Sequence, residues 1–315
     1  MIFRLKHGLG AIHIIAIEAT DNNDKILRCY INGSFSTFQD FSFDNPTPLL
    51  NSSCYDPSKQ TVFYTYGFGG KNNGPSVETL FRAYVALNFN FILVGWEKGA
   101  SNESGVLGYP TAAENALIDG KQLGQVLITL TNAGLSAISI ILIGFSLGAH
   151  FMGEAGKEFQ TSGQIIPLLI GLDPAGPLFL VRGINPQCAV FVCILHTNPS
   201  GLGTTQSRGR VDVWPNCPSR VQPACAAAGG GIGFMTPENM CSHDTSWRYY
   251  AEAITMSNTH VARPASSCRS FRAGNGGNLT FTIQVNLDTS RRGNFYYVTN
   301  AAPIYGRGVA GANPN

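Results

Sequence analysis

The segment Ile138-Ser-Ile-Ile-Leu-Ile-Gly-Phe-Ser-Leu-Gly148 decides the fold of this chain of 315 residues. Its first six residues form an apolar run typical of a buried strand. The last five fit the pattern G-x-S-x-G, and the residues that follow, 147–159, can form a helix. A strand, a tight turn that needs small residues at Gly144 and Gly148, and a helix together predict a nucleophile elbow with Ser146 at its apex. The pattern alone is weak because the chain contains 36 glycines, so the surrounding elements must support it.

Short apolar runs alternate with helical patterns from residue 61 onward, which predicts a mostly parallel central sheet covered by helices. We expect a single α/β domain over residues 20–315. In such a sheet ligands bind beyond the carboxyl ends of the strands, so the residues that follow each strand are the candidates for a functional site. The expected strands are 61–66, 90–96, 138–143 and 165–172, and the expected helices are 76–87, 113–130 and 147–159.

The candidate acids lie between the serine and the later histidines. A serine hydroxyl becomes a strong nucleophile when a histidine removes its proton and a carboxylate orients that histidine. On this fold the expected order is serine, acid, histidine. Asp173 follows the run 165–172 and precedes Pro174, which places it at the carboxyl end of a strand. Asp212 lies in a strand-like alternation that favours a solvent-facing carboxylate.

Three histidines beyond the elbow are candidates for the base: His196, His243 and His260. His243 stands where a loop gives way to a helical pattern, and a residue there can reach across the edge of the sheet. His196, at the end of a strand-like run, is the structural alternative. His150 lies one helical turn after Ser146, where a packing or capping role is more common. The residues favour His243 without excluding His196.

The tetrahedral intermediate of acyl transfer needs two aimed N–H donors. The first should be the residue after the nucleophile, Leu147. The second should come from a loop after an early strand, and Gly67-Phe-Gly-Gly70 follows the expected strand 61–66 directly. We therefore expect the oxyanion hole to consist of the backbone N–H groups of Phe68 and Leu147.

Composition limits the partners and the compartment. Charged residues make up 13% of the chain, hydrophobic residues 44%, and the net charge is +2, so no nucleic-acid-binding surface is indicated. A basic start, the apolar run 8–17 and Glu18-Ala19 predict a signal peptide over residues 1–19, with a core strand or an anchor helix as alternatives. No run approaches the roughly 18 apolar residues needed to span a bilayer.

The eight cysteines agree with export. Their even number favours disulfides, and none shows the paired spacing with histidines that a zinc site requires, so we expect no metal and no cofactor. Their pairing stays open at this point. The sequons at Asn32, Asn51, Asn102 and Asn278 also agree with a secreted, extracellular glycoprotein.

Several motifs, taken together, resemble the animal pancreatic-lipase family, and within it the insect lipases and phospholipases A1 that stop after the catalytic domain. The similarity runs from about residue 60 to the end. It is carried by Tyr66-Gly-Phe-Gly, Val94-Gly-Trp-Glu-Lys-Gly-Ala100, Gly144-Phe-Ser-Leu-Gly-Ala-His150, Gly171-Leu-Asp-Pro-Ala-Gly-Pro177, His196-Thr197, Asp212 to Asn216, Cys241-Ser-His243 and Arg292 to Asn300.

The resemblance implies an α/β-hydrolase fold in which Ser146 is the nucleophile, Asp173 the acid and His243 the base, the same residues that position and spacing favour. It also implies the disulfide Cys225–Cys241, which would close a lid loop, residues 226–240, over the site. That loop is rich in glycine and carries the apolar residues Ile232, Phe234 and Met235, as expected of a mobile flap that meets lipid.

The activity implied is that of a secreted serine ester hydrolase, a triacylglycerol lipase or phospholipase A1, acting at a membrane, micelle or lipoprotein surface. The lid length favours phospholipids or mixed glycerolipids only slightly. No β-sandwich follows the catalytic region in this sequence, so a colipase-type partner is not expected. Two alternatives remain: a non-catalytic lipid-binding or yolk-storage protein, and a carboxylesterase of soluble esters. Tyr66 and Gly95 depart from the histidine and aspartate that many relatives carry.

Overall fold

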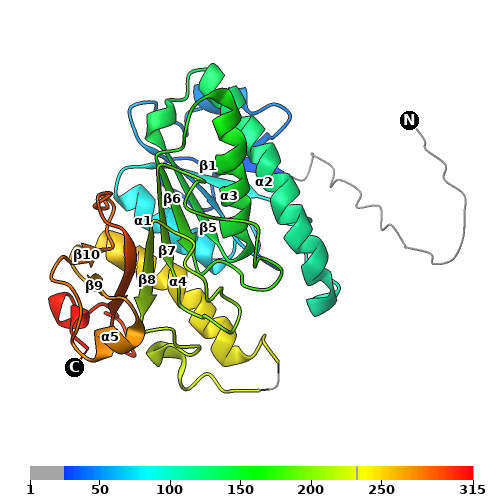
Figure 1. The fold of residues 1–315 in the computed structure, drawn as a ribbon. Coiled ribbons are helices and arrows are strands. Elements are labelled where there is room, and N and C mark those ends of the chain that lie inside the picture. The colour runs from blue at the N-terminus through cyan, green and yellow to red at the C-terminus, as the bar shows by residue number, and fades with distance from the viewer. Residues whose placement is uncertain (1–24, 232, 315) are drawn as a thin grey trace, which may run out of the picture.

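The strands of the computed structural model, which describes residues 25–231 and 233–314, form one sheet (Figure 1). Their order in that sheet is β10-β9-β11-β8-β7-β6-β5-β3-β4-β1-β2. The strands are β1 Ile26–Tyr30, β2 Phe38–Ser42, β3 Thr61–Thr65, β4 Asn90–Gly95, β5 Ile140–Phe145, β6 Leu168–Leu172, β7 Phe191–Leu195, β8 Val211–Pro215, β9 Val261–Pro264, β10 Phe281–Thr282 and β11 Gly293–Tyr297.

Helices cover both faces of the sheet. In Figure 1, α2 and α3 lie side by side on one side of the central strands, while α1 packs against α4 on the other. The helices are α1 Pro75–Ala86, α2 Tyr109–Asn132, α3 Leu147–Phe159, α4 Pro237–Thr255 and α5 Cys268–Arg272, with the 3₁₀ helices η2 Thr47–Asn51, η3 Gly105–Gly108, η4 Ala137–Ser139, η5 Gln160–Ser162, η6 Pro223–Cys225 and η7 Val309–Ala312.

The central strands β4, β3, β5, β6, β7, β8 and β11 are parallel, and antiparallel strands continue the sheet at both ends. From β3 the chain crosses through α1 to β4 on one side, and from β4 it returns through α2 past β3 to β5. Right-handed crossovers in opposite directions place α1 and α2 on opposite faces. The order therefore reverses between β3 and β5, and this switch point is where an α/β sheet binds its ligand.

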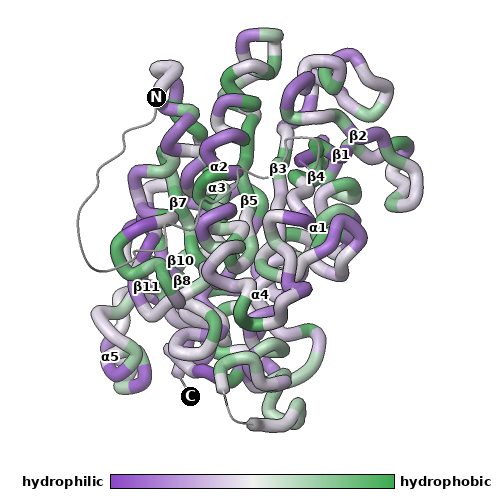
Figure 2. The backbone as a smooth tube through the Cα atoms, turned by 90° about the vertical axis from the view of Figure 1, so that its right-hand side faces the viewer, coloured by the Kyte–Doolittle hydropathy of each residue, from purple (hydrophilic) through white to green (hydrophobic). Residues whose placement is uncertain are grey.

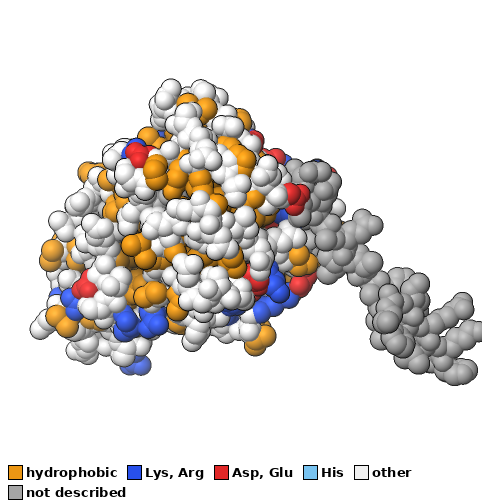
Figure 3. Space-filling model, turned by 90° about the horizontal axis from the view of Figure 1, so that it is seen from above, with side chains coloured by type: hydrophobic (Ala, Val, Ile, Leu, Met, Phe, Trp, Pro, Cys, Tyr) orange, Lys and Arg blue, Asp and Glu red, His pale blue; other side chains and the backbone are white. Residues whose placement is uncertain are grey.

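The expected α/β class, with a mostly parallel sheet covered by helices, is confirmed. The strands expected at 61–66 and 90–96 are β3 and β4, and both are buried at every position, as continuous apolar runs predict. Hydrophobic residues concentrate along central strands such as β5 and β7 in Figure 2. On the face drawn in Figure 3, hydrophobic side chains cover more of the surface than charged ones do. The signal peptide expected at residues 1–19 lies outside the described residues.

Candidate active site

Ser146 lies in a sharp turn between β5 and α3, where its backbone has φ 57° and ψ −122°, left-handed values that residues with a side chain rarely adopt. Its N–H donates to the carbonyl of Leu172, 3.0 Å away, which fixes the turn on the end of β6. A Cβ atom at Gly144 would lie 2.1 Å from the carbonyl oxygen of Gly148, and one at Gly148 would lie 2.6 Å from that of Thr65. Both glycines are therefore required for the turn to close.

Asp173 and His243 form a buried pair next to this turn. The Nδ1 atom of His243 lies 2.5 Å from Oδ2 of Asp173, and the two residues are 4% and 0% exposed. The other oxygen of Asp173 accepts hydrogen bonds from the N–H groups of Thr197 at 2.7 Å and Asn198 at 3.0 Å. The two backbone donors hold the carboxylate in the orientation in which Oδ2 faces the imidazole of His243.

The position of His243 in the chain differs from the expected helix start. Helix α4 begins at Pro237, six residues earlier, and His243 lies in its second turn. Thr236 caps the helix by accepting a hydrogen bond from the N–H of Asn239 at 3.3 Å. Threonine at the N-cap followed by proline at the first helical position is a start signal that the sequence contains. The sequence reasoning missed it because the apolar periodicity begins later, at Trp247.

Ser146 and His243 both line one small cavity of about 40 Å³. Aromatic and aliphatic side chains complete its wall, and its residues come from loops after β3, β6 and β7, the start of α2, the segment before α4 and the first turns of α4. Besides the serine and the histidine these are Phe68, Tyr109, Ala175, Pro177, Leu202, Phe234, Met235 and Met240.

The loop after β3 packs directly on the turn that holds the serine. A Cβ atom at Gly67 would lie 2.4 Å from the Cβ of Ser146 and 3.1 Å from the backbone nitrogen of Leu147, so only glycine allows this approach. Within residues 25–231 and 233–314, the N–H groups of Phe68 and Leu147 donate no hydrogen bond to another residue. The two amides expected to form an oxyanion hole thus belong to segments in contact, and both are available to a ligand.

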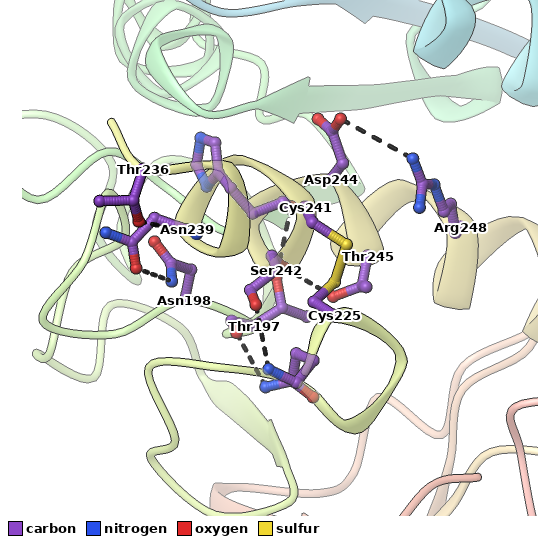
Figure 4. Close-up of a disulfide and its surroundings, with 12 residues drawn as sticks. Thr197, Asn198, Cys225, Thr236, Asn239, Cys241, Ser242, Asp244, Thr245 and Arg248 are labelled. Atoms are coloured by element: carbon purple, nitrogen blue, oxygen red, sulfur yellow. Dashed lines mark hydrogen bonds and ion pairs between the residues drawn. A yellow bond between two sulfur atoms is a disulfide. The ribbon is translucent and has the colours of Figure 1, made fainter. Parts of the chain in front are cut away.

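Residues 226–240, which we call the lid segment, run along the lower edge of the molecule in Figure 1. The expected disulfide Cys225–Cys241 closes this loop at its two ends (Figure 4). Arg220 donates to Oδ1 of Asn239 at 2.9 Å and to the carbonyl of Gly233 at 3.2 Å. Asn239 in turn donates to the carbonyl of Phe234 at 2.7 Å, so these hydrogen bonds hold the lid segment over the cavity. Ile232 lies outside the described residues.

Asn198 connects the lid segment to the acid. Its side chain donates to Oδ1 of Asn239 at 3.3 Å, a contact visible in Figure 4, while its backbone N–H donates to Asp173. The same asparagine therefore contacts both the carboxylate that binds His243 and Asn239 of the lid segment.

Three other histidines make structural contacts, and of these His260 contacts the hydroxyl of Tyr297 and Oε1 of Glu252, each at 2.9 Å. His150 contacts the carbonyl of Ala175 at 2.8 Å through Nε2 and accepts from the N–H of Ile184 through Nδ1, and burial lowers its pKa to about 3. His196 pairs with Asp212 at 2.8 Å and stacks on Trp214. The expectation that Asp212 faces solvent is wrong: it is 1% exposed. Its strand β8 lies inside the sheet and is covered on both faces, so alternation does not indicate solvent there.

Six of the eight cysteines form disulfides. Besides the lid pair, Cys29 bonds to Cys54 near one end of the sheet, and Cys217 bonds to Cys268 near the other. The expectation of disulfides is confirmed for these six, while Cys188 and Cys193, whose pairing the sequence left open, are buried free thiols. Burial raises the pKa of Cys188 to about 11 and that of Cys193 further, so neither is a reactive thiolate at neutral pH.

Across residues 25–231 and 233–314, no cluster of three or more histidine, cysteine, aspartate or glutamate side chains could hold a metal ion. Within those ranges, no helix combines the length and the apolar character needed to cross a bilayer.

A serine at a strained strand–helix turn, an Asp–His pair and a mostly parallel sheet define the class of the α/β hydrolases. Within that class, residues 13–282 match the model of the family described as Lipase, and the chain belongs to this family. The resemblance to pancreatic lipases is thereby confirmed.

Curated relatives carry lipase names. Lipase member H of Xenopus tropicalis is 33% identical over 247 residues, which are 75% of this chain and 50% of the relative. Pancreatic triacylglycerol lipase of Oryctolagus cuniculus is 32% identical over 267 residues, 78% of this chain and 54% of the relative. Inactive pancreatic lipase-related protein 1 of Mus musculus is 30% identical over 265 residues, with the same two shares. The chain thus spans about half the length of the curated relatives it matches.

Solved structures show a weaker similarity. A dienelactone hydrolase-like promiscuous phosphotriesterase from metagenomic libraries is 13% identical, with a TM-score of 0.36 over 57% of this chain and 71% of that one. A hydrolase of the alpha/beta superfamily from Xanthomonas campestris is 18% identical, with a TM-score of 0.32 over 44% of this chain and 71% of that one. The fold assignment rests on the strand order and the family match.

Proposed function

We propose that this chain is a secreted serine hydrolase that cleaves carboxylic esters of glycerolipids, as a phospholipase A1 or triacylglycerol lipase, through an acyl-enzyme on Ser146. The observation that carries the proposal is the buried Asp173–His243 pair, whose histidine lines the same cavity as the strained serine. Family membership and the apolar wall of the cavity support a lipid substrate, and three disulfides support an extracellular location.

In the first half of the reaction Nε2 of His243 takes the proton of the Ser146 hydroxyl while Oγ attacks the ester carbonyl. Asp173 holds Nδ1–H of the imidazole, which leaves Nε2 free as the base and stabilises the imidazolium that forms. The N–H groups of Phe68 and Leu147 donate to the oxyanion. The tetrahedral intermediate then expels the alcohol, which leaves with the proton from His243.

In the second half a water molecule gives its proton to His243 and attacks the acyl carbonyl. The carbon–oxygen bond to Ser146 breaks, the serine recovers its proton and the fatty acid is released. Charge develops at the same oxygen in both halves, so one pair of amides serves both transition states.

A fluorophosphonate probe tests this proposal, because an activated serine displaces fluoride from phosphorus and remains bonded to it. We expect one equivalent of probe on Ser146, located by peptide mass spectrometry, and release of fatty acid from phosphatidylcholine vesicles or triolein emulsion. Failure of the folded protein to label at Ser146 would favour a non-catalytic lipid-binding protein. Turnover of a soluble short-chain ester without any lipid turnover would favour a carboxylesterase.

The small size of the cavity makes movement of the lid segment part of the proposal. Its volume of about 40 Å³ is far below the roughly 300–1,000 Å³ of pockets that bury a ligand, and it cannot hold an acyl chain. The lid segment contributes Phe234 and Met235 to the wall, so displacing it enlarges the cavity.

Loss of the Arg220 hydrogen bonds is expected to ease that movement. We expect Arg220→Ala to raise the rate of hydrolysis of a soluble short-chain ester about threefold to tenfold, since two hydrogen bonds to the lid segment disappear. The rate is measured with the ester below KM in the absence of lipid. Arg269→Ala, at another exposed arginine, controls for the lost charge and should leave the rate unchanged. A rate at or below that of the unmodified protein would contradict a closing role for Arg220.

A further inference from the structure

Exposed hydrophobic side chains are concentrated around the cavity that holds Ser146. Over the described residues, 17 large hydrophobic side chains are exposed, and eight of them lie on three segments that reach the cavity. We call these eight the apolar rim. They are Val106 and Leu107 before α2, Leu178, Leu180 and Val181 after β6, and Phe234, Met235 and Met240 on the lid segment.

The first two segments of the rim meet at the cavity. The hydroxyl of Tyr109 donates to the carbonyl of Pro177 at 3.1 Å, and both residues line the cavity beside Ser146. Arg182 forms an ion pair with Glu114 of α2, a second link between the same segments. The rim is therefore continuous with the entrance through which a substrate reaches the serine.

The turn 178–181 is held with its apolar side chains outward. The guanidinium of Arg208, which is 8% exposed, donates to the carbonyls of Phe179, Leu180 and Arg182. Phe179 points inward and stacks on the ring of His150, with 3.6 Å between ring centroids. Its neighbours Leu180 and Val181 are 72% and 95% exposed. Three hydrogen bonds from a buried guanidinium therefore hold this turn with its tip exposed.

Few charges would have to leave water if the rim entered an apolar phase. The segments 101–109, 175–183 and 226–240 contain three charged side chains, Glu103, Arg182 and Glu238, and Arg182 is already paired. Leucine and valine gain free energy on leaving water, whereas an unpaired charge loses it. A protein partner on this rim would cover the entrance to the cavity, but a lipid surface would supply substrate to it.

We propose that the turn 178–181, together with Val106 and Leu107, inserts into the surface of a lipid aggregate and holds the cavity entrance against it. The role of this anchor in catalysis rests on the proposed function, but its binding to lipid requires no catalysis. Apolar residues presented by a fixed turn act here as an anchor, as they do on interfacial helices.

Vesicle binding tests the anchor. In a Ser146→Ala background we expect Leu180→Asn with Val181→Asn to weaken sedimentation with phosphatidylcholine vesicles at least tenfold. Ile138→Asn is the matched control, because Ile138 is 83% exposed and precedes β5 at the opposite end of that strand from Ser146. It should bind as the background protein does. Melting temperatures report that all variants are folded.

A tryptophan introduced at the tip of the turn gives a positive fluorescence signal for insertion, which a misfolded variant would not give. Val181→Trp should show a blue shift with vesicles and quenching by brominated phosphatidylcholine, while Ile138→Trp should show neither. Undiminished binding of the double variant, absence of quenching at position 181, or no binding to vesicles at all would overturn the anchor. Dimerisation that the double variant abolishes would assign the rim to a second copy and also overturn it. Because the background lacks the serine, these results are independent of whether the protein hydrolyses lipid.

Discussion

Replacing Ser146 with alanine is expected to lower kcat/KM about 10⁴-fold or more on every ester the protein hydrolyses. The change removes one oxygen atom, the proposed nucleophile, and keeps the Cβ that the strained backbone already accommodates. Binding and the proposed oxyanion amides remain, so a small residual rate over water is expected. Steady-state rates on phosphatidylcholine, triolein and a soluble ester measure the loss, and unchanged thermal unfolding shows that the fold survives.

Ser76→Ala is the matched control for this variant. Ser76 and Ser146 are each 8% exposed, but Ser76 lies on α1, outside the cavity wall. We expect its rates to stay within about threefold of the unmodified protein, since it removes a hydroxyl of the same burial. Equal rates for Ser146→Ala and the unmodified protein would refute the serine mechanism.

Asp173→Asn is expected to reduce kcat/KM by about 10⁴, as a change of the acid does in serine proteases. One oxygen of Asp173 accepts two backbone N–H groups and the other accepts Nδ1–H of His243. An amide has only one acceptor oxygen. If it faces the backbone donors, its NH₂ group faces His243 and selects the tautomer that carries the proton on Nε2, where no base remains.

The second buried Asp–His pair supplies the control for this prediction. Asp212→Asn also disturbs an aspartate that binds a histidine and two backbone N–H groups, those of Arg208 and Gly209. We expect it to lower the melting temperature by several degrees while the rate on a soluble ester stays within about tenfold. A loss as large as that of Asp173→Asn would show that catalysis depends on packing near β8 rather than on the proposed acid.

The parts of the site set by strand ends were predictable from sequence. Ser146 and Asp173 follow β5 and β6, whose continuous apolar runs are recognisable because turns bound them. The carboxyl ends of parallel strands lie at one edge of a sheet, so these two residues were expected to lie close together. The glycine requirement was predictable for the same reason, since a turn this sharp admits no side chain at positions 144 and 148. His243 was favoured from its position, but its helix began earlier than the periodicity indicated.

Contacts between residues far apart in the sequence could not be predicted from local patterns. The burial of Asp212 depends on which strands flank β8, and no local pattern contains that information. The same holds for Cys188 and Cys193, since the number of cysteines gives no distances. Two of the hydrogen bonds that fix the lid segment run from Arg220 to Gly233, 13 residues away, and from Asn198 to Asn239, 41 residues away. No sequence motif marks either contact.

A reducing environment would break the three disulfides, and none of them lies within the turn of Ser146 or joins Asp173 to His243. Two of them fasten strands near the ends of the sheet, and the third closes the lid segment. The turn of Ser146 and the Asp173–His243 pair depend on backbone geometry and hydrogen bonds at the sheet centre. Redox conditions therefore act first on access to the serine and on the periphery of the fold, and only afterwards on the reacting groups themselves.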